Sequence, residues 1–331
     1  GRMDTITRAP VGGGATQTLD YDYDGGLIDS VEASGAAEGR YSYVHDDDMS
    51  VSSVTLTAQG DVASISIERD ADGRITGYGP FSWHRGGPIG GVSEIEDGNS
   101  SVTVDVDDVG RPWQRALSVA GQEVYRVELS FDAVGRIERR IETVAGAERV
   151  LDHAYDVDGR LESVWLDGVL SETYTYDLNG NRDSTLVSTA SFDEQDRLIE
   201  HGGVVYAFDD DGFLNQRGAD EFEYSARGEL LTATVGGETV TYDYDAFARR
   251  VARTDDDGVL QVFYGNSDAP FRITATRDSA GALTTYHYDP QGHLFALLRG
   301  DPWDQAQWYH VATDPVGSPR VVTDVAGNTV K

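Results

Sequence analysis

Cysteine is absent from this 331-residue sequence, and lysine occurs only once, as Lys331. Without cysteine the chain can form no disulfide, no thiolate nucleophile and no cysteine-ligated metal site. The seven histidines show no His-x-x-x-His or His-Glu-x-x-His spacing, so we predict no metal site of this kind and no cofactor. No stretch has the pattern of a signal peptide or of a transmembrane run of about 18 apolar residues.

Positive charge is scarce as well, because 26 lysines and arginines face 58 aspartates and glutamates, which gives a net charge of -32. The acids gather in short runs such as Asp46-Asp47-Asp48 and Asp255-Asp256-Asp257 rather than in one acidic tail. Such a surface repels nucleic acid, so no nucleic-acid partner is expected.

The hydrophobic content of 39% is ordinary for a folded protein, and no Pro- or Ser-rich linker divides the chain. We therefore expect residues 1–331 to form one continuous body. Its repeats are loosely patterned over 1–100 and regular over 101–300, and residues 301–331 form a closing hairpin. The opening Gly1-Arg2-Met3 has the pattern of the second half of a repeat turn, so we expect further repeats before it.

A short motif, aromatic-Asp-x-x-Gly, recurs from end to end, and Tyr176-Asp177-Leu178-Asn179-Gly180 is its clearest copy. The Asp can accept hydrogen bonds from the backbone of a type I turn, and the Gly can take the left-handed conformation that rejoins a strand. The predicted structural turns are Asp22 with Gly25, Asp70 with Gly73, Asp107 with Gly110, Asp132 with Gly135, Asp156 with Gly159, Asp177 with Gly180, Asp209 with Gly212, Asp255 with Gly258, Asp289 with Gly292, Asp314 with Gly317, and Asp324 with Gly327.

Two copies lack the glycine, because Asp196 follows Asp193 and Ala248 follows Asp245 at that position. Asp tolerates the left-handed region, whereas Ala there costs roughly 1 kcal/mol. We therefore expect a different turn geometry at Ala248.

Residues between the turns alternate at period two, which predicts an all-β fold with one hairpin per repeat. Five Tyr-x-Tyr pairs place two rings on one strand face and predict aromatic ladders across the sheet; a carbohydrate-binding role for them is the alternative. The pairs are Tyr21/Tyr23, Tyr41/Tyr43, Tyr174/Tyr176, Tyr242/Tyr244 and Tyr286/Tyr288. Residues 77–91 indicate an irregular connection in which Trp83 covers the core, rather than a ligand site made by Trp83-His84-Arg85.

The number of repeats predicts a curved wall. Roughly fourteen repeats of two strands, spaced about 4.8 Å apart, make a sheet about 130 Å wide, which must curl. Closed into one circuit, it would have a diameter of about 40 Å, too wide for side chains to fill. We expect repeated β-hairpins coiled into a β-spiral, barrel-like and hollow, with room for a polypeptide.

Four segments carry a resemblance to a known family: 176–181, 208–218, 288–296 and 314–328. They resemble the YD-repeat (RHS) superfamily, and most closely the C-terminal YD shell of teneurins and bacterial teneurin-like proteins. The resemblance implies a non-catalytic shell that encloses a polypeptide, namely the C-terminal toxin or cargo of a large bacterial secreted or cell-surface protein. The implied partners are the remainder of its own longer chain: upstream repeats, end plugs and cargo. The alternative that the resemblance allows is an extracellular adhesion module that binds a protein or glycan receptor.

The same resemblance marks Asp314 and Asp324 as candidate catalytic residues, since such aspartates support self-cleavage in some toxin-carrying relatives. Against this, Thr313 stands where self-cleaving relatives tend to have Arg, so we favour structural turns. We expect Pro319 at an edge or bulge of the closing hairpin, and Arg320 paired with Asp314 or Asp324, which would keep both carboxylates ionised.

The aspartate clusters that start at Asp156 and Asp209 imitate the opening of a calcium loop. Neither has the Glu expected near position twelve of such a loop, so we interpret both as solvated turns and predict no metal.

Overall fold

The computed structural model describes residues 2–10 and 15–331, and it is built almost entirely of strands. Within these ranges the only helical element is a short 3-10 turn, η1 (Trp303–Gln305). None of the described helices is long and apolar enough to cross a membrane. The predicted all-β class is confirmed, and the expected turn involving Gly1 lies outside the described residues.

The strands fall into two successive sheets. The first contains β1 (Thr5–Arg8), β2 (Gln17–Asp24), β3 (Leu27–Ser34), β4 (Gly39–His45), β5 (Val51–Ala58), β6 (Asp61–Arg69), β7 (Ile75–Tyr78), β8 (Phe81–Gly86), β9 (Gly91–Glu96), β10 (Ser100–Val106), β11 (Pro112–Val119), β12 (Gln122–Phe131), β13 (Ile137–Val144), β14 (Ala147–Tyr155), β15 (Leu161–Leu166), β16 (Val169–Tyr176) and β17 (Arg182–Thr185). The second contains β18 (Ala190–Phe192), β19 (Leu198–His201), β20 (Val204–Phe208), β21 (Leu214–Arg217), β22 (Asp220–Tyr224), β23 (Leu230–Val235), β24 (Glu238–Tyr244), β25 (Arg250–Asp255), β26 (Gly258–Phe263), β27 (Ala275–Arg277), β28 (Leu283–Tyr288), β29 (Leu294–Gly300), β30 (Gln307–Thr313) and β31 (Pro319–Thr323).

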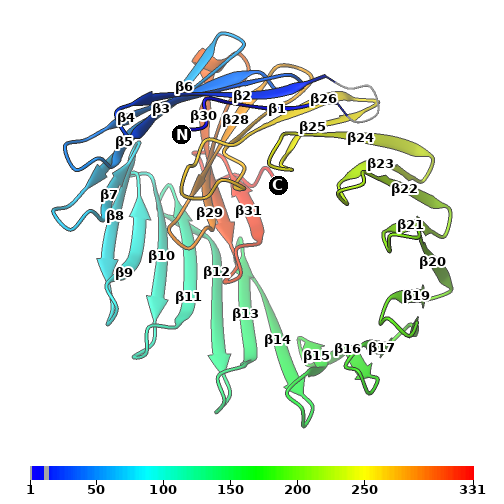
Figure 1. Cartoon of the computed structure of the whole chain (residues 1–331). Helices are drawn as coiled ribbons and strands as arrows, with labels where there is room; N and C mark the ends of the chain where they lie inside the picture. The colour runs from blue at the N-terminus through cyan, green and yellow to red at the C-terminus, as the bar shows by residue number, and fades with distance from the viewer. Residues whose placement is uncertain (1, 11–14) are drawn as a thin grey trace.

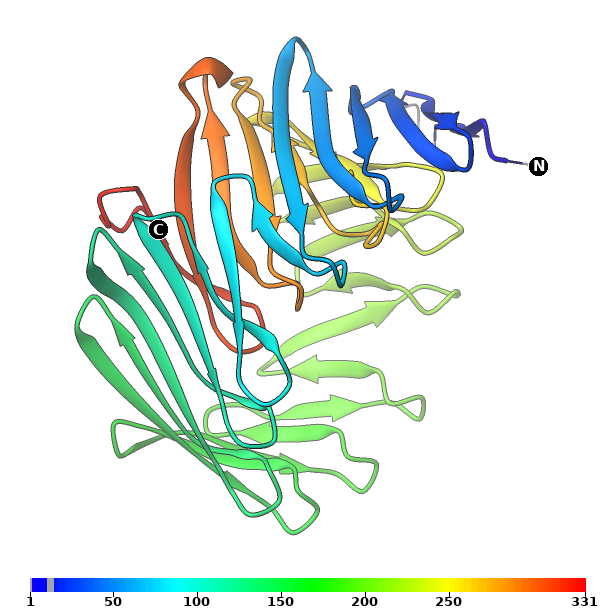
Figure 2. The ribbon, with the colours of Figure 1, turned by 90° about the vertical axis from the view of Figure 1, so that its left-hand side faces the viewer.

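Each strand pairs antiparallel with the next along the chain, and the bridge Ser184–Thr189 carries the wall from one sheet to the other. Near most repeat turns the register shifts by one residue, as between Ser130 and Phe131, so that Phe131 faces Ile137. Such bulges increase the local twist of a hairpin. Repeated along the chain, the twist coils the wall into a spiral (Figures 1 and 2).

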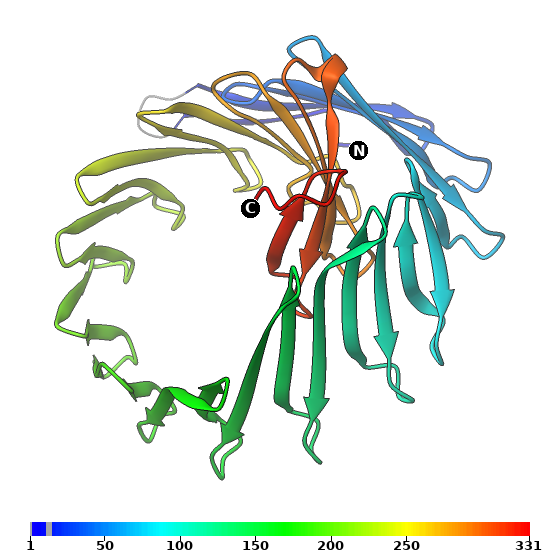
Figure 3. The ribbon, with the colours of Figure 1, turned by 180° about the vertical axis from the view of Figure 1, so that it is seen from behind.

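The last coil of the spiral overlaps the first, and the two hydrophobic cores lie between these two overlapping layers. In one core, Tyr41 and Leu56 of the first coil pack with Phe263 and Leu283 of the last coil. In the other, strands β8 to β12 pack against β29 to β31, and the rings of Phe81 and Phe295 meet edge to face at 5.0 Å. The last strands therefore lie on the inner side of the first coil (Figure 3).

Between these overlaps the wall is a single layer. Among the described residues, strands β16 to β22 contain no fully buried side chain, and they form the open arc of the ring in Figure 1. The accessible surface is 17884 Å², whereas a compact monomer of 35.9 kDa exposes roughly 13,300 Å². The chain is thus a coiled wall rather than a filled body.

The structure corrects the prediction for residues 77–91. This segment contains β8 and parts of β7 and β9 rather than an irregular connection, because the glycines at positions 79 and 87 make short turns. Trp83 belongs to β8 and is buried in a core.

Two predicted turns are also placed differently. Asp22 lies inside β2 opposite Ser30, because Gly25 and its glycine neighbour connect β2 to β3 in only two residues. Asp255 similarly pairs directly with Gly258 at the end of a two-residue connection. Both copies therefore lack the longer turn of the other repeats.

Candidate functional site

The repeat turn has the same internal geometry in most copies, and the turn at Asp132 shows it. The Asp132 N–H donates to the Arg136 carbonyl (2.8 Å), and the Gly135 N–H donates to the Asp132 carbonyl (3.0 Å). Asp132 Oδ1 accepts the N–H groups of Val134 (3.0 Å) and Arg136 (2.9 Å), while Gly135 has a φ of 89°. The carboxylate and the glycine together satisfy the backbone of the turn.

The same two closing backbone bonds recur at Asp70 with Gly73, Asp107 with Gly110, Asp156 with Gly159, Asp177 with Gly180, Asp193 with Asp196, Asp209 with Gly212, Asp245 with Ala248, Asp289 with Gly292, Asp314 with Gly317 and Asp324 with Gly327. Three further turns have this geometry and are not among the predicted Asp–Gly pairs: Asp46 with Met49, Ser225 with Gly228 and Asp278 with Gly281. The Asp-x-x-Gly spacing at Asp278 was a usable signal, although no aromatic residue precedes it.

The turn at Ala248 keeps this geometry, so the prediction of a different one is wrong. Ala248 has a φ of 62°, and its N–H donates to the Asp245 carbonyl (3.1 Å). The surroundings hold it there, because Arg249 pairs with the buried Asp245 carboxylate (2.6 Å) and Arg8 donates to the Asp245 carbonyl (3.0 Å).

Neighbouring repeats are joined by contacts that we call the inter-repeat clamp. Arg136 donates to Asp132 of its own turn (2.7 Å), and its guanidinium lies 4.3 Å from the ring centre of Tyr155 in the next repeat. The Tyr155 hydroxyl in turn donates to the Ile137 carbonyl (2.7 Å). Each turn is thereby tied to the end of the strand that enters the next turn.

The guanidinium-on-ring contact of the clamp recurs along the wall, with Arg111 over Phe131, Arg160 over Tyr176, Arg197 over Phe208, Arg249 over Tyr264 and Arg272 over Tyr288. The sequence predicts ladders in which aromatic rings stack on one another, whereas these repeats meet through an Arg guanidinium that lies over an aromatic ring of the next repeat. The reason is chemical. Except at Arg272, which pairs with no turn Asp among the described residues, the Arg stands immediately before the next strand and is already fixed by the turn Asp, and its flat cation suits an aromatic face.

The closing hairpin of β30 and β31 positions both candidate catalytic aspartates. Asp314 is buried, and its Oδ1 accepts the N–H groups of Val316 (3.1 Å) and Ser318 (2.9 Å). Asp324 accepts the N–H groups of Ala326 and Asn328 (both 2.9 Å).

The two carboxylates do not lie side by side. Asp314 and Asp324 open turns at opposite ends of β31, whose five residues span roughly 16 Å. A hydrogen bond from the Asn328 side chain holds the pKa of Asp324 below its usual value. The arrangement therefore offers turn-forming carboxylates, not two groups that share a proton.

The prediction that Arg320 pairs with Asp314 or Asp324 is wrong, because Arg320 binds Glu142 of the first coil through two hydrogen bonds (2.8 and 2.9 Å). Arg140 (2.9 Å) and the Tyr125 hydroxyl (3.0 Å) also donate to this buried carboxylate. Burial alone would raise the pKa of Glu142, but the Arg320 hydrogen bond and the two guanidinium charges hold it below its usual range. Arg140 also lies 3.6 Å from Asp314.

Other buried charges cross between the first and last coils in the same way. Arg115 lies 3.1 Å from Asp289 and 3.2 Å from His293 Nδ1, and Arg8 binds Glu229 through two hydrogen bonds (2.7 and 2.8 Å). Burial lowers the pKa of His293. These contacts join residues more than 170 positions apart, so periodicity along the chain gave no sign of them.

The structure also shows how the calcium-like clusters are used. Asp156 is occupied by Arg160 (2.8 Å) and by the backbone of its own turn. No group of three or more His, Asp or Glu side chains within residues 2–10 and 15–331 is arranged to hold a metal ion. Pro319 lies opposite Thr313 at the bulge of the closing hairpin.

Comparison with known proteins matches residues 10–331 to the family model described as Teneurin YD-shell. Teneurin-3 of Mus musculus is 31% identical over 95% of this chain and 12% of its own length. Teneurin-4 of Homo sapiens is 30% identical over 96% of this chain and 12% of its own length. The chain thus spans about one eighth of these relatives.

Two solved structures share the fold. A mutant Tc holotoxin pore of Photorhabdus luminescens superposes with a TM-score of 0.51 at 13% identity, covering 98% of this chain and 23% of that one. A TcdB2–TccC3–Cdc42 complex gives a TM-score of 0.50 at 14% identity with the same coverage. At this identity the likeness concerns the fold alone.

Proposed function

The chain belongs to the teneurin YD-shell family, and from this premise we propose that it forms part of the wall of a non-catalytic shell that encloses a polypeptide. The proposed occupant is the C-terminal toxin or cargo of the same, longer protein. That protein is proposed to be secreted or displayed at a cell surface, and to be bacterial.

The observation that carries the proposal is that the accessible surface area of the chain exceeds that of a compact protein of the same mass. The accessible area exceeds the roughly 13,300 Å² of a compact monomer by about one third, and strands β16 to β22 form a single layer. A β-sheet of one layer leaves both faces without a protein partner within this chain. A wall with two such faces suits an enclosure whose interior is occupied by other chain segments.

The scale of the wall favours a polypeptide as occupant. Metabolite sites are pockets of about 300–1,000 Å³ that bury most of the ligand, whereas the single-layer arc curves widely (Figure 1). Because the chain spans 12% of its teneurin relatives, we propose that upstream repeats, end plugs and cargo of its own longer protein complete the enclosure.

We assign structural roles to Asp314 and Asp324 within this proposal. Each carboxylate is used by the backbone of its own turn, and Arg140 lies beside Asp314. This leaves neither aspartate free to act as a general acid or base without breaking its turn. The same reasoning applies to the other turn aspartates.

Small-angle scattering of the intact parent protein tests the proposal, with the parent truncated after Lys331 as the matched control. We expect equal outer dimensions for the two proteins and a lower internal density for the truncated one. A compact particle with no internal low-density volume would contradict enclosure. Unequal outer dimensions, with the missing segment on the outside, would also contradict it.

An extracellular adhesion module is the second candidate, favoured by identity to teneurins over 95% of the chain. The segment that the parent protein carries after Lys331 distinguishes the two candidates. A variable toxin-like domain there supports cargo storage. A membrane anchor, or a shell that ends without cargo, supports adhesion through the outer face.

A further inference from the structure

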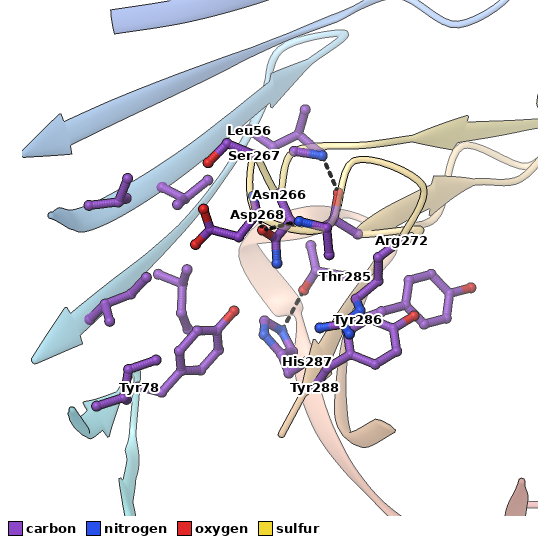
Figure 4. A pocket seen from close by; sticks show the side chains of 18 of the residues that line it. Leu56, Tyr78, Asn266, Ser267, Asp268, Arg272, Thr285, Tyr286, His287 and Tyr288 are labelled. Carbon is purple, nitrogen blue, oxygen red and sulfur yellow. Dashed lines mark hydrogen bonds between the residues drawn. The ribbon is translucent and has the colours of Figure 1, made fainter. Parts of the chain in front are cut away.

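We propose that the cavity between the first and last coils of the wall binds a small amphipathic monocarboxylate. The cavity has a volume of about 410 Å³ and lies between strands β4 to β8 of the first coil and β28 of the last (Figure 4). The loop 265–274 covers it. This volume is within the range of small-molecule sites.

One end of the cavity is apolar. Val51, Val54, Leu56, Ile65 and Ile67 of the first coil line it with aliphatic side chains. These five side chains carry no hydrogen-bonding group, so they suit an alkyl or aryl body. Ser64 and Arg69 of β6 line the cavity as well, and Arg69 donates to the Val51 carbonyl (2.6 Å). Burial of such a body is favourable at about 25 cal/mol per Å² of apolar surface removed from water.

The other end gathers donors around Tyr78. The rings of His287 and Trp83 lie 5.7 and 5.9 Å from the Tyr78 ring. Burial raises the pKa of Tyr78 to about 12 while the nearby Arg272 charge opposes the rise, so its hydroxyl stays protonated at neutral pH. The side chains of Tyr78, Trp83, His287 and Arg272 therefore share this end, and Tyr286 and Tyr288 line the cavity as well.

Two nitrogens at this end are buried without a partner. Trp83 Nε1 and His287 Nδ1 make no hydrogen bond to the described residues, and both side chains are 5% exposed. The other His287 nitrogen, Nε2, is 2.8 Å from the Thr285 hydroxyl, so Nδ1 carries the ring proton when that hydroxyl donates. Both nitrogens have almost no accessible surface, so an acceptor reaches them only when neighbouring side chains move aside, and it then removes the cost of an unsatisfied buried donor.

Two guanidinium groups, Arg69 and Arg272, line the cavity, and Arg272 is the one beside the Tyr78 end. Its guanidinium stacks on the Tyr288 ring at 5.0 Å, and it has no ion pair with any acidic residue in the described part of the chain. A carboxylate satisfies a guanidinium and neutral N–H donors together. Asp268 and Asp289 also line the cavity, and their charge disfavours a ligand with a second negative group.

The covering loop is held in place by its own hydrogen bonds. The Tyr43 hydroxyl donates to the Gly265 carbonyl (3.0 Å), and the Gly265 N–H donates to Thr274 Oγ1 (2.8 Å). Asn266 Oδ1 accepts the Asp268 N–H (2.9 Å). Asp268 itself is exposed, as are Ser64 and Pro290, which also line the cavity, so the cavity is open to solvent at these residues.

Calorimetric titration of the full chain with decanoate, and separately with decanol, tests the proposal. We expect decanoate to bind at least about tenfold more tightly than decanol, because only the carboxylate meets Arg272. Arg272→Gln should remove that difference, while Arg74→Gln, at an exposed turn outside the cavity, should leave it unchanged.

The location is checked by tryptophan fluorescence. Decanoate should change the emission of the wild-type chain, and Trp83→Phe should abolish most of that change. Equal affinity for decanoate and decanol, no binding of either, or an unchanged preference in Arg272→Gln would each overturn the proposal. If Arg272→Gln fails to fold, the wild-type comparison and Trp83→Phe still decide it.

Discussion

The ion pair between Glu142 on β13 and Arg320 on β31 should hold the last coil against the first. We predict that Glu142→Ala destabilises the chain by about 3 kcal/mol. Four hydrogen bonds to the carboxylate are lost, two of them from Arg320, and the buried site is left with guanidinium charge that has lost its partner.

The size of the predicted stability loss follows from the exposure of the two side chains. Glu142 has a side-chain exposure of 5%, but Arg320 is 40% exposed and can regain water when its partner is removed. This places the loss at the lower end of the roughly 3–5 kcal/mol found when a buried pair is broken. With an unfolding entropy of about 0.7 kcal/mol/K for a chain of this length, the melting temperature should fall by about 4 °C.

The same strand supplies the control. Arg139 pairs with Asp152 at 2.6 Å, with exposures of 51% and 33%, so Asp152→Ala should cost no more than about 1 kcal/mol. Urea unfolding of Glu142→Ala, Arg320→Met and the double variant should give a coupling energy above about 1 kcal/mol. Equal costs for Glu142→Ala and Asp152→Ala, or a coupling near zero, would refute the role assigned to the pair.

Three further predictions concern the closing hairpin, acid and the covering loop. Asp314→Asn should lower the melting temperature more than Asp324→Asn does, since Asp314 is buried beside Arg140. Neither substitution should change the processing pattern of the parent protein on a gel. A lost cleavage product with unaltered melting would make the pair catalytic. Backbone hydrogen bonding lowers the pKa of turn aspartates such as Asp107 in the folded chain. The stability that these aspartates give is therefore present above their unfolded pKa of about 4 and is lost as pH falls through the lower folded values. Circular dichroism should show that unfolding begins below about pH 4, and unchanged stability down to pH 2 would contradict this. Gly265→Ala should cost about 2 kcal/mol or more, because a Cβ there would lie 2.1 Å from the Tyr41 ring, whereas unaltered melting would show that the loop can shift.

The sequence alone was sufficient for the local architecture. The Asp-x-x-Gly spacing predicts turns that are closed by a carboxylate and a left-handed residue, and period-two alternation predicts the strands between them. Both depend on residues within about ten positions of one another, so local chemistry determines them. The resemblance of segments such as 314–328 to the YD-repeat family is confirmed by the family match.

Local patterns failed where neighbouring structure overrides them. Ala248 keeps the common turn because Arg8, from the other end of the chain, fixes Asp245. Asp22 lies in the strand rather than in the turn because two adjacent glycines allow a two-residue connection two positions later. In each case a group outside the Asp-x-x-Gly motif, Arg8 or the second glycine, contributes to the outcome.

Only the tertiary structure decided what lies across the overlap of the spiral. Arg320 meets Glu142, Arg115 meets Asp289, and the cavity beneath loop 265–274 takes its walls from strands some two hundred residues apart. Which turn of the last coil faces which strand of the first depends on the twist and bulges summed over all the strands between them. Small errors in each hairpin accumulate over that distance, so a repeat pattern specifies the wall but not the register in which it meets itself.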